Sequence, residues 1–122
     1  SNIPLNNESI ELLLRISWLY FRYNEFVYGK RILDEIETKI ETESNLFEML
    51  IYAKMEYYIQ IGNTTKAFEE NTKLLRIKKE KNDDSGLLGV LNRRGRLYDE
   101  QNQYEKAIEC DLYILNKLCD VL

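Results

Sequence analysis

One spacing occurs three times in this chain of 122 residues, and it constrains the fold more than any other feature. In each copy a tyrosine stands nine positions before a residue with little or no side chain. The three pairs are Tyr20 and Gly29, Tyr58 and Ala67, and Tyr98 and Ala107. The small residues recur after 38 and then 40 positions. This regularity predicts a structure built from repeats of about 40 residues.

The sequence around these pairs predicts helices. Apolar residues recur at helical spacing in "SIELLLRISWLYF" and in residues 47–61 and 87–98. Residues that favour caps and turns separate these runs: Asn24, Ser44-Asn45, Gly62-Asn63-Thr64, Asn82 to Gly86, and Gln101-Asn102. We therefore predict six helices, over residues 8–23, 25–42, 45–61, 64–81, 86–100 and 103–120. Such short connections make neighbouring helices antiparallel, so the helices form three hairpins.

The small residues have a mechanical role in this prediction. Antiparallel helices that cross closely need a residue without bulk, and Gly29, Ala67 and Ala107 supply one in each second helix. Gly95 and Ser17 stand three positions before their tyrosines in the first helices. The aromatic residues are expected to pack between hairpins, which stack into a solenoid because no hairpin buries its apolar faces alone. The tyrosines assigned to packing are Tyr57, Tyr58, Tyr98 and Tyr104.

The segment "LNRRGRLYDEQNQYEKAIECDLYIL" resembles a tetratricopeptide repeat, with a small residue and an aromatic in a first helix and aromatic-x-x-Ala opening a second. "IYAKMEYYIQIGNTTKAFEENTKLL" and "LRISWLYFRYNEFVYGKRIL" are weaker copies. The resemblance implies an all-α, right-handed solenoid in one domain, residues 1–122, with repeats at about 8–43, 44–82 and 84–121. The common repeat has 34 residues and a closing proline. Here Glu41, Lys79 and Cys119 stand at that position, so each pair of helices is expected to be longer by about a turn.

Elongated repeats of this kind resemble those in the peptide-sensing domains of bacterial quorum-sensing regulators. The resemblance implies a noncatalytic scaffold that binds a peptide or protein segment, as a sensor or regulatory domain of a bacterial transcription regulator. In that family the first helices line a concave groove. Rotation from the small residue and the tyrosine places three residues of each first helix toward this groove. They are Leu14, Trp18 and Phe21, then Tyr52, Glu56 and Ile59, then Asn92, Arg96 and Asp99.

From this set we predict six peptide-binding residues. A planar amide and a guanidinium one turn apart, Asn92 and Arg96, match a peptide amide and a carboxylate. An exposed Trp18 would anchor a partner. The remaining three are Leu14, Tyr52 and Glu56. Simpler interpretations remain open: Trp18 belongs to the core or contacts a neighbouring repeat, and Asn92 and Arg96 are solvated.

Other chemistry has little support in the sequence. Histidine is absent, which removes Ser-His-Asp and Cys-His nucleophiles and most zinc sites, and no phosphate-binding glycine loop occurs. We expect no enzyme, no cofactor and no metal. Eight basic residues gather at Lys73, Arg76, Lys78, Lys79 and Lys81 and at Arg93, Arg94 and Arg96. They fit either a docking patch for an acidic ligand or, for the first five, a solubilising helix end.

Composition narrows the partners and the location. The net charge of −4 disfavours nucleic-acid binding by the chain as a whole, and no run of apolar residues would span a membrane. A cytoplasmic protein is expected, in which Cys110 and Cys119 stay reduced because they lie too far apart on one helix to bridge. Ser1-Asn2 resembles a cleaved-tag remnant, so a piece of a longer protein is expected. Apolar residues from Leu118 to Leu122 and in the first helix leave homo-oligomerisation open.

Overall fold

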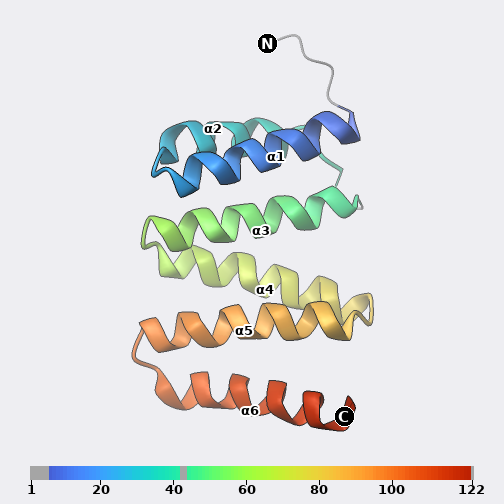
Figure 1. Ribbon diagram of the computed structural model, residues 1–122, viewed down its shortest axis with the longest axis vertical. Coiled ribbons are helices and arrows are strands. Elements are labelled where there is room, and N and C mark those ends of the chain that lie inside the picture. Colours follow the sequence, from blue (N-terminus) through green and yellow to red (C-terminus); the bar gives the residue numbers. More distant parts are fainter. Residues whose placement is uncertain (1–5, 42–43, 122) are drawn as a thin grey trace. The chain divides into compact units, whose positions relative to one another are not determined.

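The computed structural model describes residues 6–41 and 44–121, and within them the chain is all-α (Figure 1). Six helices and no strand occur in these residues, which confirms the predicted class and number of helices. The helices are α1 (Asn7–Arg22), α2 (Phe26–Glu37), α3 (Asn45–Gln60), α4 (Thr64–Glu80), α5 (Asp84–Glu100) and α6 (Tyr104–Val121). The expected remnant Ser1-Asn2 lies outside the described residues.

Most helix ends lie within two residues of the prediction, but α2 is shorter than predicted. It ends at Glu37, whereas the sequence predicted residue 42. The Thr38 hydroxyl donates a hydrogen bond to the Glu35 carbonyl at 2.8 Å. A hydroxyl that bonds its own backbone competes with the next helical turn, and the chain leaves the helix here. The start of α5 also differs from the prediction, by two residues. The helix begins at Asp84 because the Asp83 side chain accepts a hydrogen bond from the Gly86 amide at 2.9 Å and caps it.

The turns between helices rely on left-handed backbone conformations. Asparagine and glycine adopt these conformations at lower cost than other residues, and both commonly end helices in this way. The sequence marked these residues as turn signals, and the structure assigns them specific positions just after the ends of α1, α3, α4 and α5. They are Asn24 (φ 62°), Gly62 (φ 77°), Asn82 (φ 53°) and Asn102 (φ 61°).

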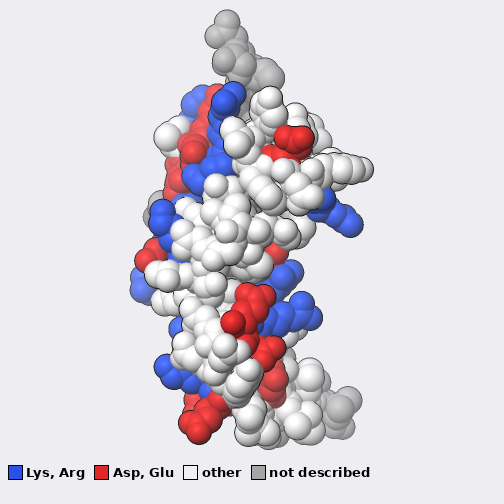
Figure 2. Space-filling model, turned by 90° about the vertical axis from the view of Figure 1, so that its left-hand side faces the viewer, with Lys and Arg blue, Asp and Glu red and all other residues white. Residues whose placement is uncertain are grey.

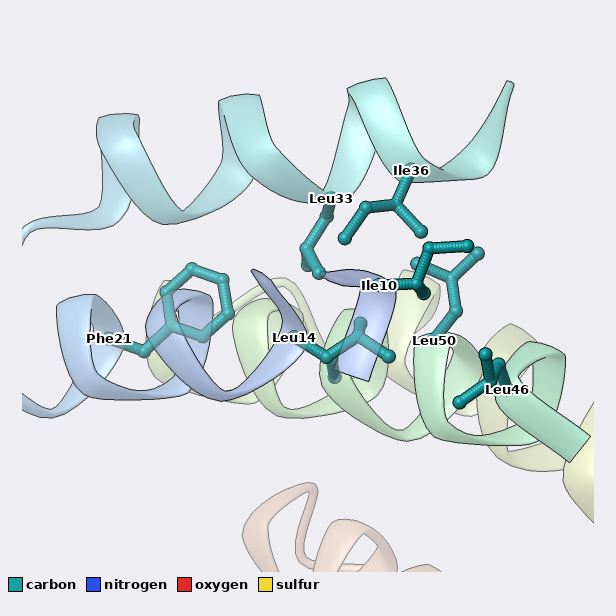
Figure 3. Packing of buried hydrophobic residues seen from close by; sticks show 8 residues of the cluster. Ile10, Leu14, Phe21, Leu33, Ile36, Leu46 and Leu50 are labelled. Carbon is teal, nitrogen blue, oxygen red and sulfur yellow. The ribbon is translucent and has the colours of Figure 1, made fainter. Parts of the chain in front are cut away.

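The chain divides into two compact units, Ser1–Ala67 and Phe68–Leu122, which we call unit 1 and unit 2. In unit 1, helices α1, α2 and α3 all pack against one another. Figure 3 shows the core that they form, with Leu33 and Ile36 of α2 directed toward residues of α1 and α3. The buried cluster consists of Ile10, Leu14, Phe21, Leu33, Ile36, Leu46, Leu50 and Ala53.

In unit 2, α5 packs against α6, and the C-terminal part of α4 is tied to α5 by a buried polar side chain. Asn71 of α4 is fully buried and donates through Nδ2 to the Val90 carbonyl at 3.0 Å. Its Oδ1 accepts from Arg94 Nη1 at 2.9 Å. Nearby, the rings of Phe68 and Tyr98 lie 4.8 Å apart. A polar bridge therefore sets the register of α4 against α5.

Two of the small residues of the repeat, Gly29 and Gly95, face a neighbouring helix at close range, as predicted. Gly29 in α2 is buried against the ring of Phe21 in α1. Gly95 in α5 faces α6, where an added Cβ would lie 3.4 Å from Cys110 Cβ and 3.8 Å from the Ala107 carbonyl oxygen. A Cβ at Gly29 would clash with the Phe21 ring, whereas a Cβ at Gly95 would just make van der Waals contact with α6.

The packing role predicted for four tyrosines is confirmed for three. Tyr57 and Tyr58 are half-buried with ring centroids 5.2 Å apart, and Tyr98 lies against Phe68. For Tyr104 the prediction is wrong. Its side chain is 56 % exposed, and its hydroxyl donates to Asn102 Oδ1 at 2.8 Å. The first position of α6 lies at the surface, where the ring finds a local polar partner instead of a packing site.

Two glycine substitutions are expected to have effects of opposite sign. A Cβ at Gly29 would lie 2.8 Å from Phe21 Cδ1, and the Phe21 ring is itself buried against Tyr57. Gly29→Ala should therefore lower the free energy of unfolding by about 1–3 kcal/mol, the usual cost of overpacking. Gly89→Ala in α5 meets no atom within 4 Å and should raise it by about 0.5–1 kcal/mol, because alanine favours the helix. Urea denaturation of both variants checks the signs, and a stabilising Gly29→Ala would contradict the packing described for α1 and α2.

Candidate functional site

Asn92, Arg96 and Asp99, predicted to face a groove, are exposed and line one depression in unit 2. Its volume is about 430 Å³, and α6 forms its other wall. The α6 side chains include Tyr104, Ile108 and Asp111. Residues at 92, 95, 96 and 99 share one face of α5 because they are three or four positions apart.

The side chains in this depression are available for a ligand. Neither Asn92 nor Arg96 forms a hydrogen bond or ion pair with any other described residue. Ile108 is 55 % exposed and adds an apolar surface beside them. Two carboxylates, Asp99 and Asp111, share the depression with the Arg96 guanidinium. The site therefore offers both donors and acceptors, which suits a peptide backbone better than a simple anion.

The four predicted residues of unit 1 differ in their exposure. Trp18 is 38 % exposed and Tyr52 is half-buried, so both have surface that a partner can contact. Glu56 is only 6 % exposed and Leu14 only 2 %. The prediction that Leu14 faces a groove is therefore corrected, because α2 and α3 cover this side of α1 and place Leu14 in the core. The same prediction for Glu56 is also corrected, since Glu56 is among the buried residues of α3.

The error at Leu14 comes from the assumed rotation of α1. The repeat pattern predicts that Ser17 and Tyr20 point inward and that Leu14 and Phe21 face the groove. In the structure Leu14, Ser17 and Phe21 are all buried, whereas Tyr20 is 36 % exposed beside the ring of Tyr28. The inward face follows positions 10, 14, 17 and 21, so Tyr20 does not mark it.

Two apolar stripes escaped the residue-by-residue prediction, although their spacing was visible in the sequence. On α1, exposed apolar residues recur at intervals of four and three, and a fourth follows four positions later, directly after the helix end. On α6 they recur at four, three and three. Such spacing places them on one face of a helix. The stripes are Leu12, Ile16 and Leu19 on α1 with Tyr23 directly after its end, and Ile108, Leu112, Leu115 and Leu118 on α6.

The basic run does not form one patch. Lys73 pairs with Glu70 at 3.1 Å, and Lys78 pairs with Asp83 at 3.0 Å. Arg96 lines the depression described above, whereas Arg94 and Lys79 line a different pocket. On the face drawn in Figure 2, basic and acidic side chains are interspersed. The run therefore does not form a single docking patch: two of its lysines are in local ion pairs, and Lys79 and Arg94 line a separate pocket.

Two groups in unit 2 have a shifted pKa. The hydrogen bond from the Gly86 amide and the nearby Lys78 ammonium hold the pKa of Asp83 below its usual value, as expected for an N-cap carboxylate. Burial raises the pKa of the Cys110 thiol, although the Arg94 charge opposes this effect. A raised pKa lowers the fraction of Cys110 that is present as the reactive thiolate.

Among residues 6–41 and 44–121, no three side chains of His, Cys, Asp or Glu are grouped so that they could hold a metal ion. None of the helices in the same ranges is long and apolar enough to cross a membrane. Comparison of the chain with models of protein families, with curated protein sequences and with solved structures found no match. Function is therefore argued from the surface of this chain itself.

Proposed function

We propose that this chain is a noncatalytic scaffold of three tetratricopeptide-like hairpins that stack into a right-handed solenoid. Support comes from the recurrence of the hairpin features in the described residues. Gly29 and Gly95 lie at close helix approaches, and left-handed turn residues follow α1, α3 and α5 at corresponding positions. A hairpin of this size has too little core of its own, which favours stacking.

The scaffold binds a peptide or protein segment, and the main support is the exposure of two polar side chains of α5. Asn92 and Arg96 stand exposed and without protein partners in a depression that also has an apolar edge at Ile108. A peptide would pair its backbone amide with Asn92 and a carboxylate with Arg96, while an apolar side chain covers Ile108. By its resemblance to peptide-sensing repeats, the chain would serve a cytoplasmic bacterial transcription regulator as its sensor or regulatory domain.

The test uses peptides selected from a random phage-displayed library on the full 122-residue chain. Their Kd is measured by fluorescence anisotropy for the chain and for the double variant Asn92→Ala, Arg96→Ala. We expect binding to weaken at least about tenfold, because a backbone amide and a carboxylate each lose a partner. Circular dichroism should show an unchanged fold, since both side chains are exposed.

A matched control removes the same two side-chain types elsewhere. Asn116 in α6 and Arg76 in α4 are exposed, and neither lines the depression. The pair Asn116→Ala, Arg76→Ala should leave the Kd unchanged. If the double variant Asn92→Ala, Arg96→Ala bound every selected peptide as tightly as the original chain, these residues would not form the peptide-binding site.

Self-association is a second candidate function, favoured by the apolar stripes on α1 and α6. Contiguous exposed apolar surface usually marks an interface. Sedimentation velocity over a hundredfold range of concentration should then show a growing dimer or larger species. Leu112→Glu, in the centre of the α6 stripe, should abolish this growth. A strict monomer at the highest concentration would rule the candidate out.

A further inference from the structure

A second pocket in unit 2 lies on another face of α5. It has a volume of about 370 Å³, within the range of about 300–1,000 Å³ typical of small-molecule sites. Its α5 residues are Leu87, Leu91, Arg94 and Tyr98, which recur at helical spacing. This set is rotated by roughly a third of a turn from the face that carries Asn92 and Arg96. The two sites therefore use different side chains.

Three cations from three helices converge on this pocket. Lys79 comes from α4, Arg94 from α5 and Lys106 from α6. Glu109 is the one acidic residue in the lining, so the pocket has a formal charge of about +2 in a chain whose net charge is −4. None of the three cations forms an ion pair with a carboxylate among residues 6–41 and 44–121. An excess of unpaired positive charge in a concave site attracts an anion.

The Arg94 guanidinium is held in place before any ligand binds. It lies 5.3 Å from the ring centroid of Phe68 and 5.5 Å from that of Tyr98. Its Nη1 donates to Asn71 Oδ1 at 2.9 Å and to Thr72 Oγ1 at 3.1 Å. The Nε and Nη2 donors have no acceptor among the described residues. A fixed guanidinium with free donors suits the planar oxygens of a carboxylate or a phosphate.

The rest of the pocket is apolar. Leu75 and the two leucines of α5 supply aliphatic surface, and Tyr98 and Tyr113 supply rings. Lys106 Nζ lies 5.6 Å from the Tyr98 ring centroid, which places this charge beside the aromatic wall. The lining thus combines a cationic side with an apolar one, so it favours a ligand that has both characters.

We propose that this pocket binds a small amphipathic anion, with a carboxylate or phosphate head group on an apolar or aromatic body. The head group meets Arg94, Lys79 and Lys106, and the body lies against the leucines and tyrosines. This site goes beyond the proposed peptide groove, because Asn92 and Arg96 do not line it. Either site can exist without the other.

The first test titrates the full chain with phenyl phosphate, observed by two-dimensional ¹H–¹⁵N NMR. Shifts are expected at amides around Arg94, Lys106 and Cys110. Phenol and inorganic phosphate, which each carry half of the proposed ligand, should bind at least about tenfold more weakly. If inorganic phosphate binds as tightly as phenyl phosphate, or if none of the three probes shifts these amides, the proposal is wrong.

A pair of variants assigns the binding to the cations. Lys79→Gln, Lys106→Gln should raise the Kd for phenyl phosphate at least about tenfold, since two charge-assisted contacts are lost. Lys66→Gln, Arg76→Gln removes equal charge, and Lys66 lies over Tyr58 at 5.5 Å much as Lys106 lies over Tyr98. This control should leave the Kd unchanged. Equal weakening in both double variants would indicate general charge attraction and overturn the site.

A chemical readout checks the location independently. Cys110 lines the pocket, whereas Cys119 is exposed and does not. Saturating phenyl phosphate should slow alkylation of Cys110 by iodoacetamide severalfold and leave Cys119 unaffected, as measured by mass spectrometry of the peptides. Unchanged alkylation of Cys110 would place the probe elsewhere and refute the pocket. Selected peptides that bind through Asn92 and Arg96 remain a separate measurement, so failure of one site is distinguishable from failure of the other.

Discussion

Replacement of Leu14 by alanine is expected to lower the free energy of unfolding by about 3 kcal/mol, within the usual range of about 2–5 kcal/mol for a buried leucine. Leu14 is 2 % exposed and belongs to the core that α1, α2 and α3 share (Figure 3). Alanine would leave a cavity among neighbours such as Leu33 and Leu50, which are themselves fully buried. Urea denaturation followed by circular dichroism measures the change.

Leu12→Ala provides the matched control, because Leu12 lies in the same helix and is 54 % exposed. Its effect on unfolding should stay within about 0.5 kcal/mol. The contrast separates the two interpretations of Leu14. A groove residue would lose peptide affinity and keep its stability, whereas a core residue loses stability first. Equal stability of the Leu14→Ala and Leu12→Ala variants would indicate that Leu14 lies at the surface.

Replacement of Asn71 by leucine is expected to cost about 2–4 kcal/mol of unfolding free energy, because it breaks a buried polar bridge. Leucine has the same branched shape and the same number of side-chain heavy atoms, so a cavity is not the cause. The variant loses the bond from Nδ2 to the Val90 carbonyl and removes the acceptor of Arg94 Nη1. Arg94 then keeps a partly buried charge with fewer partners, and the tie between α4 and α5 is lost. Thermal denaturation should show a clearly lowered Tm.

Asn116→Leu in α6 serves as the control for this change. Asn116 is exposed, and the same substitution there should alter stability by no more than about 0.5 kcal/mol. A second variant, Asn71→Asp, keeps the acceptor for Arg94 and should lose less stability than leucine. If Asn71→Leu were as stable as the original chain, the bridge would have no energetic role.

The local structure followed from the sequence because its signals are local. Turn residues such as Asn24 and Asn102 have a backbone preference of their own, and a hydrophobic period of 3.6 requires no knowledge of distant residues. The end of α2 escaped prediction because it coincides with a side-chain hydrogen bond from Thr38 that the residue pattern did not indicate. Caps of this kind depend on side-chain geometry that composition does not reveal.

The candidate site was predictable only in part. Exposure of Asn92 and Arg96 agrees with the expected open side of α5. Leu14 and Glu56 were assigned by the same rotation, and both are buried. In α5 the small residue Gly95 faces α6 and marks the buried side. In α1 the small residue Ser17 is also buried, but Tyr20, used as the second marker, is at the surface.

The cluster of Lys79, Arg94 and Lys106 shows what sequence reasoning misses. Lys79 and Arg94 belong to the basic run, but Lys106 lies outside it, and the other members of the run are paired or face elsewhere. Grouping by sequence assumed that neighbours in the chain are neighbours in space. A cluster drawn from three helices depends on how the helices pack, which no single stretch encodes.

The sequence by itself determined the all-α class, the six helices, their turns and the small residues where helices come close. These features depend on backbone preferences and on interactions within a few residues. Only the tertiary structure decided which side of α1 is buried, that Asn71 bridges α4 and α5, and which cations share a pocket. The physical reason is that burial and charge clustering arise from contacts between helices, and those contacts exist only after the chain has packed.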